Sequence, residues 1–133
     1  MSKNNMIKVL IKNPGRPARM VEIDNTLETL QGLVGGYIEV VLPERNNEGI
    51  LMIVNEEGKL RRMEANFALG DDLIVGTAIF IGEDGEEFRG LTEHEAGLAR
   101  GYILGPQHRM DAEMKQWNDF IHETIEKHGG DEE

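Results

Sequence analysis

Basic side chains, rather than nucleophiles, offer the clearest chemistry in this chain. Lys59 and Arg61 alternate along a predicted strand, so both side chains point to one face. Such a pair of cations, together with the backbone amides of a glycine loop, can hold a phosphate group. We expect Tyr37, Asn55 and Asn66 to lie beside them, where they can stack on or hydrogen-bond a base. These five residues form the predicted binding site for a small anionic ligand such as a nucleotide. The alternative is that the cations are solvated and balance nearby glutamates.

Groups suited to catalysis are scarce. Serine occurs only at position 2 and cysteine is absent, so the sequence argues against a serine nucleophile and excludes thiolates and disulfides. The histidines are His94, His108, His122 and His128. No two of them have the spacing of three or four residues that is usual for metal ligands on a helix. We therefore expect no metal site, no cofactor and no enzymatic activity.

The negative charge is concentrated in the second half of the chain. Residues 1–63 hold 9 Lys/Arg against 8 Asp/Glu, whereas residues 64–133 hold 5 against 17, which accounts for the net charge of −11. This distribution disfavours binding to duplex nucleic acid or anionic lipid. It leaves two alternative functions open: an acidic protein-binding inhibitor or DNA mimic, and a metal-dependent hydrolase that uses carboxylates. An acidic surface that only promotes solubility is the simplest explanation.

The hydropathy of the chain argues against a membrane protein. No apolar run approaches the length of about 20 residues that a membrane-spanning helix needs. The N-terminal residues lead into a strand-like run rather than the apolar core of a signal peptide. We expect a cytoplasmic protein, without cofactors, whose partner is a small molecule rather than a membrane.

Alternating apolar runs predict a mostly antiparallel sheet. The expected strands are residues 6–11, 19–23, 37–42, 50–54, 59–63 and 73–81. A turn at residues 55–58 joins two of these runs in a predicted hairpin. A short helix is expected at residues 27–34, because apolar residues recur there at helical spacing between Thr26, an N-cap candidate, and Gly35-Gly36.

The periodicity becomes helical after Gly90. Thr92 and Glu95 fit a capping box that opens a helix to about residue 104, and a longer helix is expected at about residues 109–127. The predicted fold class is therefore α+β: an antiparallel sheet with one short helix after the first hairpin and two C-terminal helices. Residues 1–90 form the sheet-rich core, and residues 91–133 are a helical extension of the same domain.

An apolar stripe marks the last predicted helix. It consists of Met110, Met114, Trp117 and Ile121. We predict that this stripe contributes to the interface of a homo-oligomer, because a helix added after a complete sheet can lack a surface against which to bury it. The alternative is that the stripe packs on the sheet of its own chain.

Several spaced segments resemble one known family. They are Lys8–Ile11, Glu22–Leu27, Val34–Val41, Asn55–Lys59, the segment around Asn66 and Ala68, and Ile74–Thr77. Over roughly residues 6 to 90 they are similar to the domain-of-unknown-function family DUF3846. The resemblance implies a small accessory protein of a phage or other mobile element, and it brings no catalytic residues. Together with the basic residues, it predicts a protein that sequesters a nucleotide immune signal of the host without catalysis.

Overall fold

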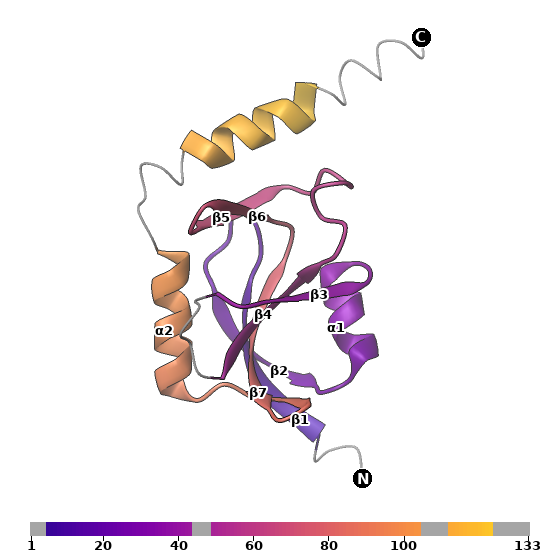
Figure 1. Cartoon of the computed structure of the whole chain (residues 1–133), viewed down its shortest axis with the longest axis vertical. Coiled ribbons are helices and arrows are strands. Elements are labelled where there is room, and N and C mark those ends of the chain that lie inside the picture. Colours follow the sequence, from indigo (N-terminus) through magenta and orange to yellow (C-terminus); the bar gives the residue numbers. More distant parts are fainter. Residues whose placement is uncertain (1–4, 44–48, 105–111, 124–133) are drawn as a thin grey trace.

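The main structural unit is a six-stranded sheet, the main sheet (Figure 1). The computed structural model describes residues 5–43, 49–104 and 112–123. In chain order the elements are β1 (Met6–Lys12), β2 (Arg19–Asp24), α1 (Leu27–Val34), β3 (Ile38–Val41), β4 (Ile50–Asn55), β5 (Ala65–Leu69), β6 (Asp72–Val75), β7 (Ala78–Asp84), β8 (Glu87–Arg89) and α2 (Glu93–Ile103). Five strands follow the order β2-β1-β7-β4-β3 and β8 pairs with β7, whereas β5 and β6 form a separate small sheet. The described strand pairs are antiparallel, and the predicted α+β class is confirmed.

Both faces of the main sheet are covered. Along β4, Ile50, Met52 and Val54 enter one core, whereas Leu51 and Ile53 enter another. This alternation follows from the pleat of a strand, which points successive side chains to opposite faces. The first core packs against α2 and the small sheet, and the second packs against α1. Figure 1 shows the two helices on opposite sides of the main sheet.

Local capping signals set the ends of the helices where the sequence predicts them. Thr26 Oγ1 accepts a hydrogen bond from Thr29 N (3.1 Å) at the start of α1. Gly35 ends this helix with φ of 81°, a left-handed conformation that glycine adopts without a steric penalty. The predicted capping box is also present at the start of α2. Thr92 Oγ1 accepts from Glu95 N (3.1 Å), and a Glu95 carboxylate oxygen accepts from Thr92 N (3.0 Å).

The predicted hairpin that pairs residues 50–54 with residues 59–63 is wrong. β4 pairs with β3 and β7 instead. Residues 56–62 form successive turns, and Arg62 has φ of 55°, which a strand does not allow. The side chains of residues 59 and 61 therefore do not share one face of a strand.

The predicted continuous strand at residues 73–81 is also wrong. It is divided into β6 and β7, which belong to different sheets. Gly76 lies between them with φ of 75°, and a Cβ atom at this position would lie only 2.8 Å from the sulfur of Met63. The chain turns at this glycine and passes from the small sheet to the main sheet. The sequence did not predict β5, the partner of β6 in the small sheet.

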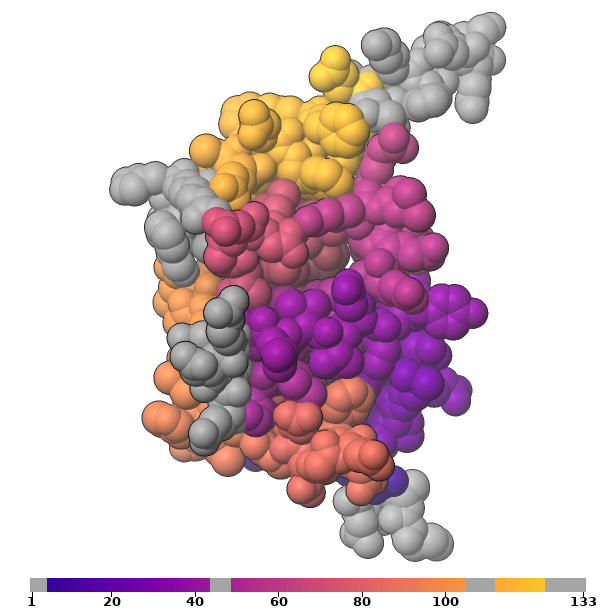
Figure 2. Space-filling view, in the orientation of Figure 1, coloured from indigo at the N-terminus to yellow at the C-terminus, as the bar shows by residue number. Residues whose placement is uncertain are grey.

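A third helical segment spans residues 112–123, so the two helices predicted after the sheet are present. Trp117 Nε1 donates a hydrogen bond to Met63 O (2.8 Å), and Met114 packs against the core under α2. Ile121 is only 4% exposed. In Figures 1 and 2 this yellow segment lies over the small sheet and the turns before it.

Candidate functional site

A groove of about 360 Å³ lies between the edge strand β3 and the small sheet. Its apolar lining comes from Val41, Val54, Leu60, Leu73, Ile74 and Val75. Its polar side chains are Glu39, Asn55, Glu56, Glu57, Lys59 and Asp72. We call it the acidic groove, because it has four carboxylates and one ammonium group. It contains two of the five residues of the predicted binding site, Asn55 and Lys59.

The two cations predicted to hold the ligand are engaged elsewhere in the chain. Lys59 forms an ion pair with Asp72, and the two side chains are 52% and 58% exposed. Arg61 Nη1 donates a hydrogen bond to Gly35 O (2.8 Å), and Arg61 does not line the groove. The excess of carboxylates makes the acidic groove a poor place for an anion.

Asn55 supports the backbone around the acidic groove. Its side chain is buried, donates from Nδ2 to Val34 O (3.0 Å) and accepts at Oδ1 from Glu57 N (2.7 Å). A Cβ atom on Gly36 would lie 2.9 Å from this Nδ2, so the glycine allows α1 to end close to Asn55. Tyr37, the next residue, is 70% exposed and is not part of the groove lining.

Asn66 lies in a different part of the molecule, within a buried polar cluster. Its Nδ2 donates to Lys12 O (2.7 Å) and to Gly76 O (2.8 Å), and its Oδ1 accepts from Lys12 Nζ (2.9 Å). Asn66 is 2% exposed. Its polar atoms join the end of β1 to the connection between β6 and β7. The structure therefore does not bring the five predicted residues together around one cavity.

A second pocket, which the sequence analysis did not predict, has two cations as its only charged side chains among the described residues. It has a volume of about 250 Å³ and lies between the proline turn after β1 and the C-terminal end of α2. Its lining residues are Lys12, Pro17, Ala18, Arg100, Ile103 and Leu104. We call it the cationic pocket.

Neither cation of this pocket pairs with a carboxylate among the residues that the structure describes. Lys12 Nζ donates to Asn13 O (2.9 Å) and to the side-chain oxygen of Asn66. Arg100 Nη1 donates to Ala18 O (3.2 Å). Partial burial lowers the pKa of Lys12 below its usual value, because removal from water disfavours the ammonium form. All these acceptors are neutral, so a bound carboxylate or phosphate would add a counter-charge that the described residues do not supply to the cationic pocket.

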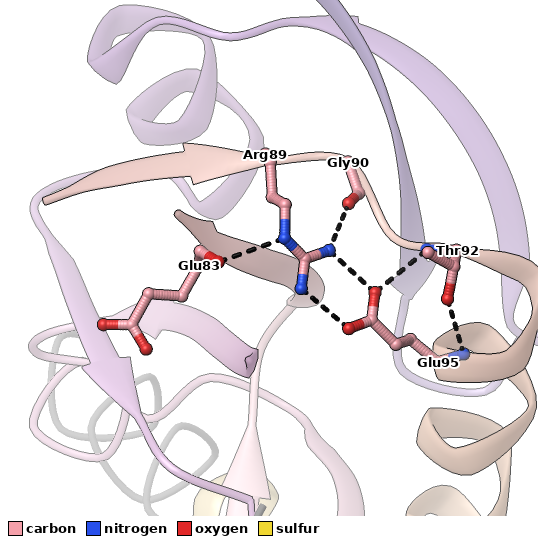
Figure 3. Close-up of polar contacts among 5 residues, drawn as sticks. All are labelled: Glu83, Arg89, Gly90, Thr92 and Glu95. Carbon is pink, nitrogen blue, oxygen red and sulfur yellow. Dashed lines mark hydrogen bonds and ion pairs between the residues drawn. The ribbon is translucent and has the colours of Figure 1, made fainter. Parts of the chain in front are cut away.

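The most fully bonded ion pair has a structural role (Figure 3). Arg89 donates from Nη1 and Nη2 to the two carboxylate oxygens of Glu95 (2.8 Å each), from Nε to Glu83 O (3.0 Å) and from Nη1 to Gly90 O (2.9 Å). This pairing lowers the pKa of Glu95 to about 2. A Cβ atom on Gly82 would lie 2.7 Å from Arg89 Cζ, so a larger residue there would displace the Arg89 side chain. The pair clamps β8 to the start of α2.

The described part of the chain has neither a metal-binding cluster nor a helix suited to a membrane. Within residues 5–43, 49–104 and 112–123, no three His, Asp or Glu side chains lie close enough together to hold a metal ion. None of the helices there combines the length and hydropathy required to cross a bilayer.

Three of the four side chains predicted to form an oligomer interface pack against their own chain. Met114 packs against the first core, Trp117 bonds to Met63 and Ile121 is buried, which agrees with the alternative that the sequence left open. Met110 lies outside the described residues. Phe120 of the same helix lies beside Trp117 and Arg62 but is 49% exposed, so the segment retains apolar surface in contact with solvent.

We expect this surface to support a homodimer. Burial of the Phe120 ring against a second copy would remove apolar area from water. Multi-angle light scattering at high micromolar concentration should give twice the chain mass, and F120S should restore the monomer. A monomer mass for the unmodified protein would contradict this prediction.

Together these features define a small α+β domain with an antiparallel sheet covered on both faces, a cationic pocket and an acidic groove. A family model described as a domain of unknown function, DUF3846, matches residues 7–103. The chain belongs to this family, as its resemblance indicated. The match includes both cations of the cationic pocket, whereas residues 112–123 lie beyond it. No curated protein and no solved structure matches the chain.

Proposed function

We propose that the protein binds a small anionic ligand in the cationic pocket and does not turn it over. The observation that carries this proposal is the placement of Lys12 and Arg100 at one pocket, where their hydrogen-bond acceptors within the described part of the chain are all neutral. An anion between them would form charge-assisted hydrogen bonds, which are stronger than those between neutral groups. Ile103 and Leu104 supply apolar surface for the uncharged part of the ligand.

A nucleotide is the ligand class that we favour. Its phosphate would neutralise the two cations, and its base would lie on the apolar wall. In the phage or mobile-element setting that the family resemblance implied, capture of a nucleotide immune signal would counter host defence. The volume of about 250 Å³ favours the smaller nucleotides. The single serine and the absence of cysteine support binding rather than turnover.

Substitution of Arg100 by glutamine is expected to weaken the binding of such a ligand by about tenfold to a hundredfold. This range corresponds to the loss of one hydrogen bond to a charged group, about 1.5–3 kcal/mol. Isothermal titration calorimetry against mononucleotides, dinucleotides and cyclic oligonucleotides measures the affinity of each. K12Q should weaken the binding of the same ligand. This substitution also removes a hydrogen-bond donor to Asn66.

The matched control is R61Q. Arg61 is also exposed and also donates a single hydrogen bond to a backbone carbonyl, but it lies outside the cationic pocket. R61Q should therefore leave the affinity unchanged. If R61Q weakens binding and R100Q does not, the ligand binds near the originally predicted residues. If none of the nucleotides gives a binding heat when titrated into the protein, the proposal is overturned.

Two alternative functions stay open as predictions. An acidic protein-binding inhibitor or DNA mimic has its support in the charge of residues 64–133, and capture of a host defence protein in a pull-down would favour it. A metal-dependent hydrolase has weaker support, because no metal-binding cluster occurs among the described residues. Hydrolysis of a nucleotide that requires an added divalent cation would favour the hydrolase.

A further inference from the structure

β3 is an edge strand with one side unpaired. Among the described residues it pairs only with β4. Tyr37 O accepts a hydrogen bond from Glu56 N (2.9 Å), so the backbone groups of the odd-numbered residues of β3 point toward β4. By the alternation of an antiparallel ladder, the N–H and C=O groups of Ile38 and Val40 then point away from the sheet. They are available to a further strand.

β3 also lacks most of the features that protect natural edge strands. Such strands are commonly short and carry lysines or prolines. β3 is short, but it holds a single charge, Glu39, and no proline. Val40 is 47% exposed, and the flanking Tyr37 and Leu42 are 70% and 61% exposed. Figure 2 shows this purple strand at the surface, below the pink small sheet. Exposed apolar side chains beside unpaired backbone groups are typical of a strand that pairs with a partner.

The acidic groove lies directly beside this edge. Glu39 and Val41 project from β3 into it, and the small sheet provides the opposite wall. A strand added to β3 would therefore place every second side chain along the groove. Three further carboxylates line it, from Glu56, Glu57 and Asp72, and its one cation already pairs with Asp72. The charge of the groove favours lysine or arginine at those alternate positions.

We propose that β3 binds an extended basic segment of a partner protein by strand addition. Main-chain hydrogen bonds to Ile38 and Val40 would supply affinity, and the carboxylates of the acidic groove would select the charge. A second copy of this chain fits less well at this edge, because the carboxylates of two acidic grooves would lie close together. This inference goes beyond the proposed capture of a small anion and uses no residue of the cationic pocket.

The test is a calorimetric titration with a blocked peptide of about ten alternating lysine and valine residues, the length of a long strand. The peptide should bind, and its affinity should fall as salt is added. E39K should weaken binding by about tenfold or more, because it places a like charge in the groove. The matched control is E22K, which changes an exposed glutamate on β2, the strand at the opposite end of the order β2-β1-β7-β4-β3. It should leave the affinity unchanged.

A second pair of measurements separates strand addition from simple charge attraction. A peptide of the same sequence with N-methyl groups on alternate backbone nitrogens should bind at least about tenfold more weakly, because it cannot complete the ladder. V40P should have the same effect on the unmodified peptide, since it removes an outward N–H group of β3. Equal binding of the methylated and unmethylated peptides, or no binding of either, would overturn the proposal. A dimer that dissociates in V40P would assign the edge to a second copy instead. If V40P does not fold, the E39K and peptide measurements still decide.

Discussion

Replacement of Asn66 by leucine is expected to lower the free energy of unfolding by about 3–5 kcal/mol. Leucine keeps a similar volume but leaves Lys12 O and Gly76 O without their donor and removes an acceptor of Lys12 Nζ. Each buried polar group that loses its partner costs about 1–3 kcal/mol. Urea denaturation followed by circular dichroism measures the change.

N118L is the matched control for this substitution. Asn118 accepts one hydrogen bond from Ala65 N (3.0 Å), at the residue that precedes Asn66. Its replacement should cost about 1 kcal/mol, the usual net value of one hydrogen bond. N66D should fall between the two, because an aspartate keeps the acceptor for Lys12 and loses both donated bonds. Equal losses for N66L and N118L would show that Asn66 is not the centre of the buried polar cluster.

Substitution of Glu95 by glutamine is expected to cost about 1.5–3 kcal/mol at neutral pH and to change the pH dependence of stability. The pKa of Glu95 is lowered from 4.5 to about 2 in the folded protein, mainly because Arg89 donates to its carboxylate. A carboxylate with a lowered pKa stabilises the folded state above its unfolded pKa. That contribution is lost as the pH falls from about 4.5 toward 2. The stability difference between the unmodified protein and E95Q should therefore shrink across this range.

The effect of Glu95 can be separated from that of helix capping. Glutamine also serves at the third position of a capping box, so E95Q removes the ion pair with Arg89 but not the cap. E93Q is the control, because Glu93 lies in the same first turn of α2 and is exposed. It should cost about 0.3–1 kcal/mol, the usual contribution of a charge near a helix end. Parallel stability curves for E95Q and the unmodified protein between pH 2 and 4.5 would contradict the assigned role of the pair.

The helices were predictable from sequence because their end signals are local. Thr26 and Gly35 bound α1, and Thr92 with Glu95 opens α2, within a few residues of the backbone groups that they satisfy. The central strands were predictable for a related reason. Their runs of β-branched and aromatic residues are bounded by turn residues, which is a local signal for a strand in an antiparallel sheet.

The errors in the fold arise from contacts between distant residues. The run at residues 73–81 is apolar apart from Thr77, so periodicity does not reveal that Gly76 must turn the chain past Met63. The predicted hairpin failed because β4 finds its partners in β3 and β7. Residues 59–63, which were expected to pair with β4, lie mostly in turns instead. The strand propensity of that segment alone does not show that β3 and β7 pair with β4 in its place.

The candidate site was harder to predict than the fold. Lys59 and Arg61 were identified by residue type, but their partners, Asp72 and Gly35 O, are set by tertiary structure. The cationic pocket combines Lys12, at the end of a strand, with Arg100, in the last turn of a helix. These residues are 88 positions apart, and neither belongs to a recognisable motif. Only the packing of α2 beside the proline turn brings them together.

β4 is apolar on both faces, so its backbone would be prone to amyloid-like pairing if it were exposed. The edge strand β3 covers one side of it. β4 has the sequence Ile-Leu-Met-Ile-Val-Asn, six uncharged residues without proline or glycine, which is the composition of segments that stack into fibrils. In the native fold its two sides are occupied by β3 and β7. Detachment of β3 alone would expose the backbone of β4 to other molecules. The four residues of β3 therefore shield the backbone of this apolar strand from pairing with other molecules.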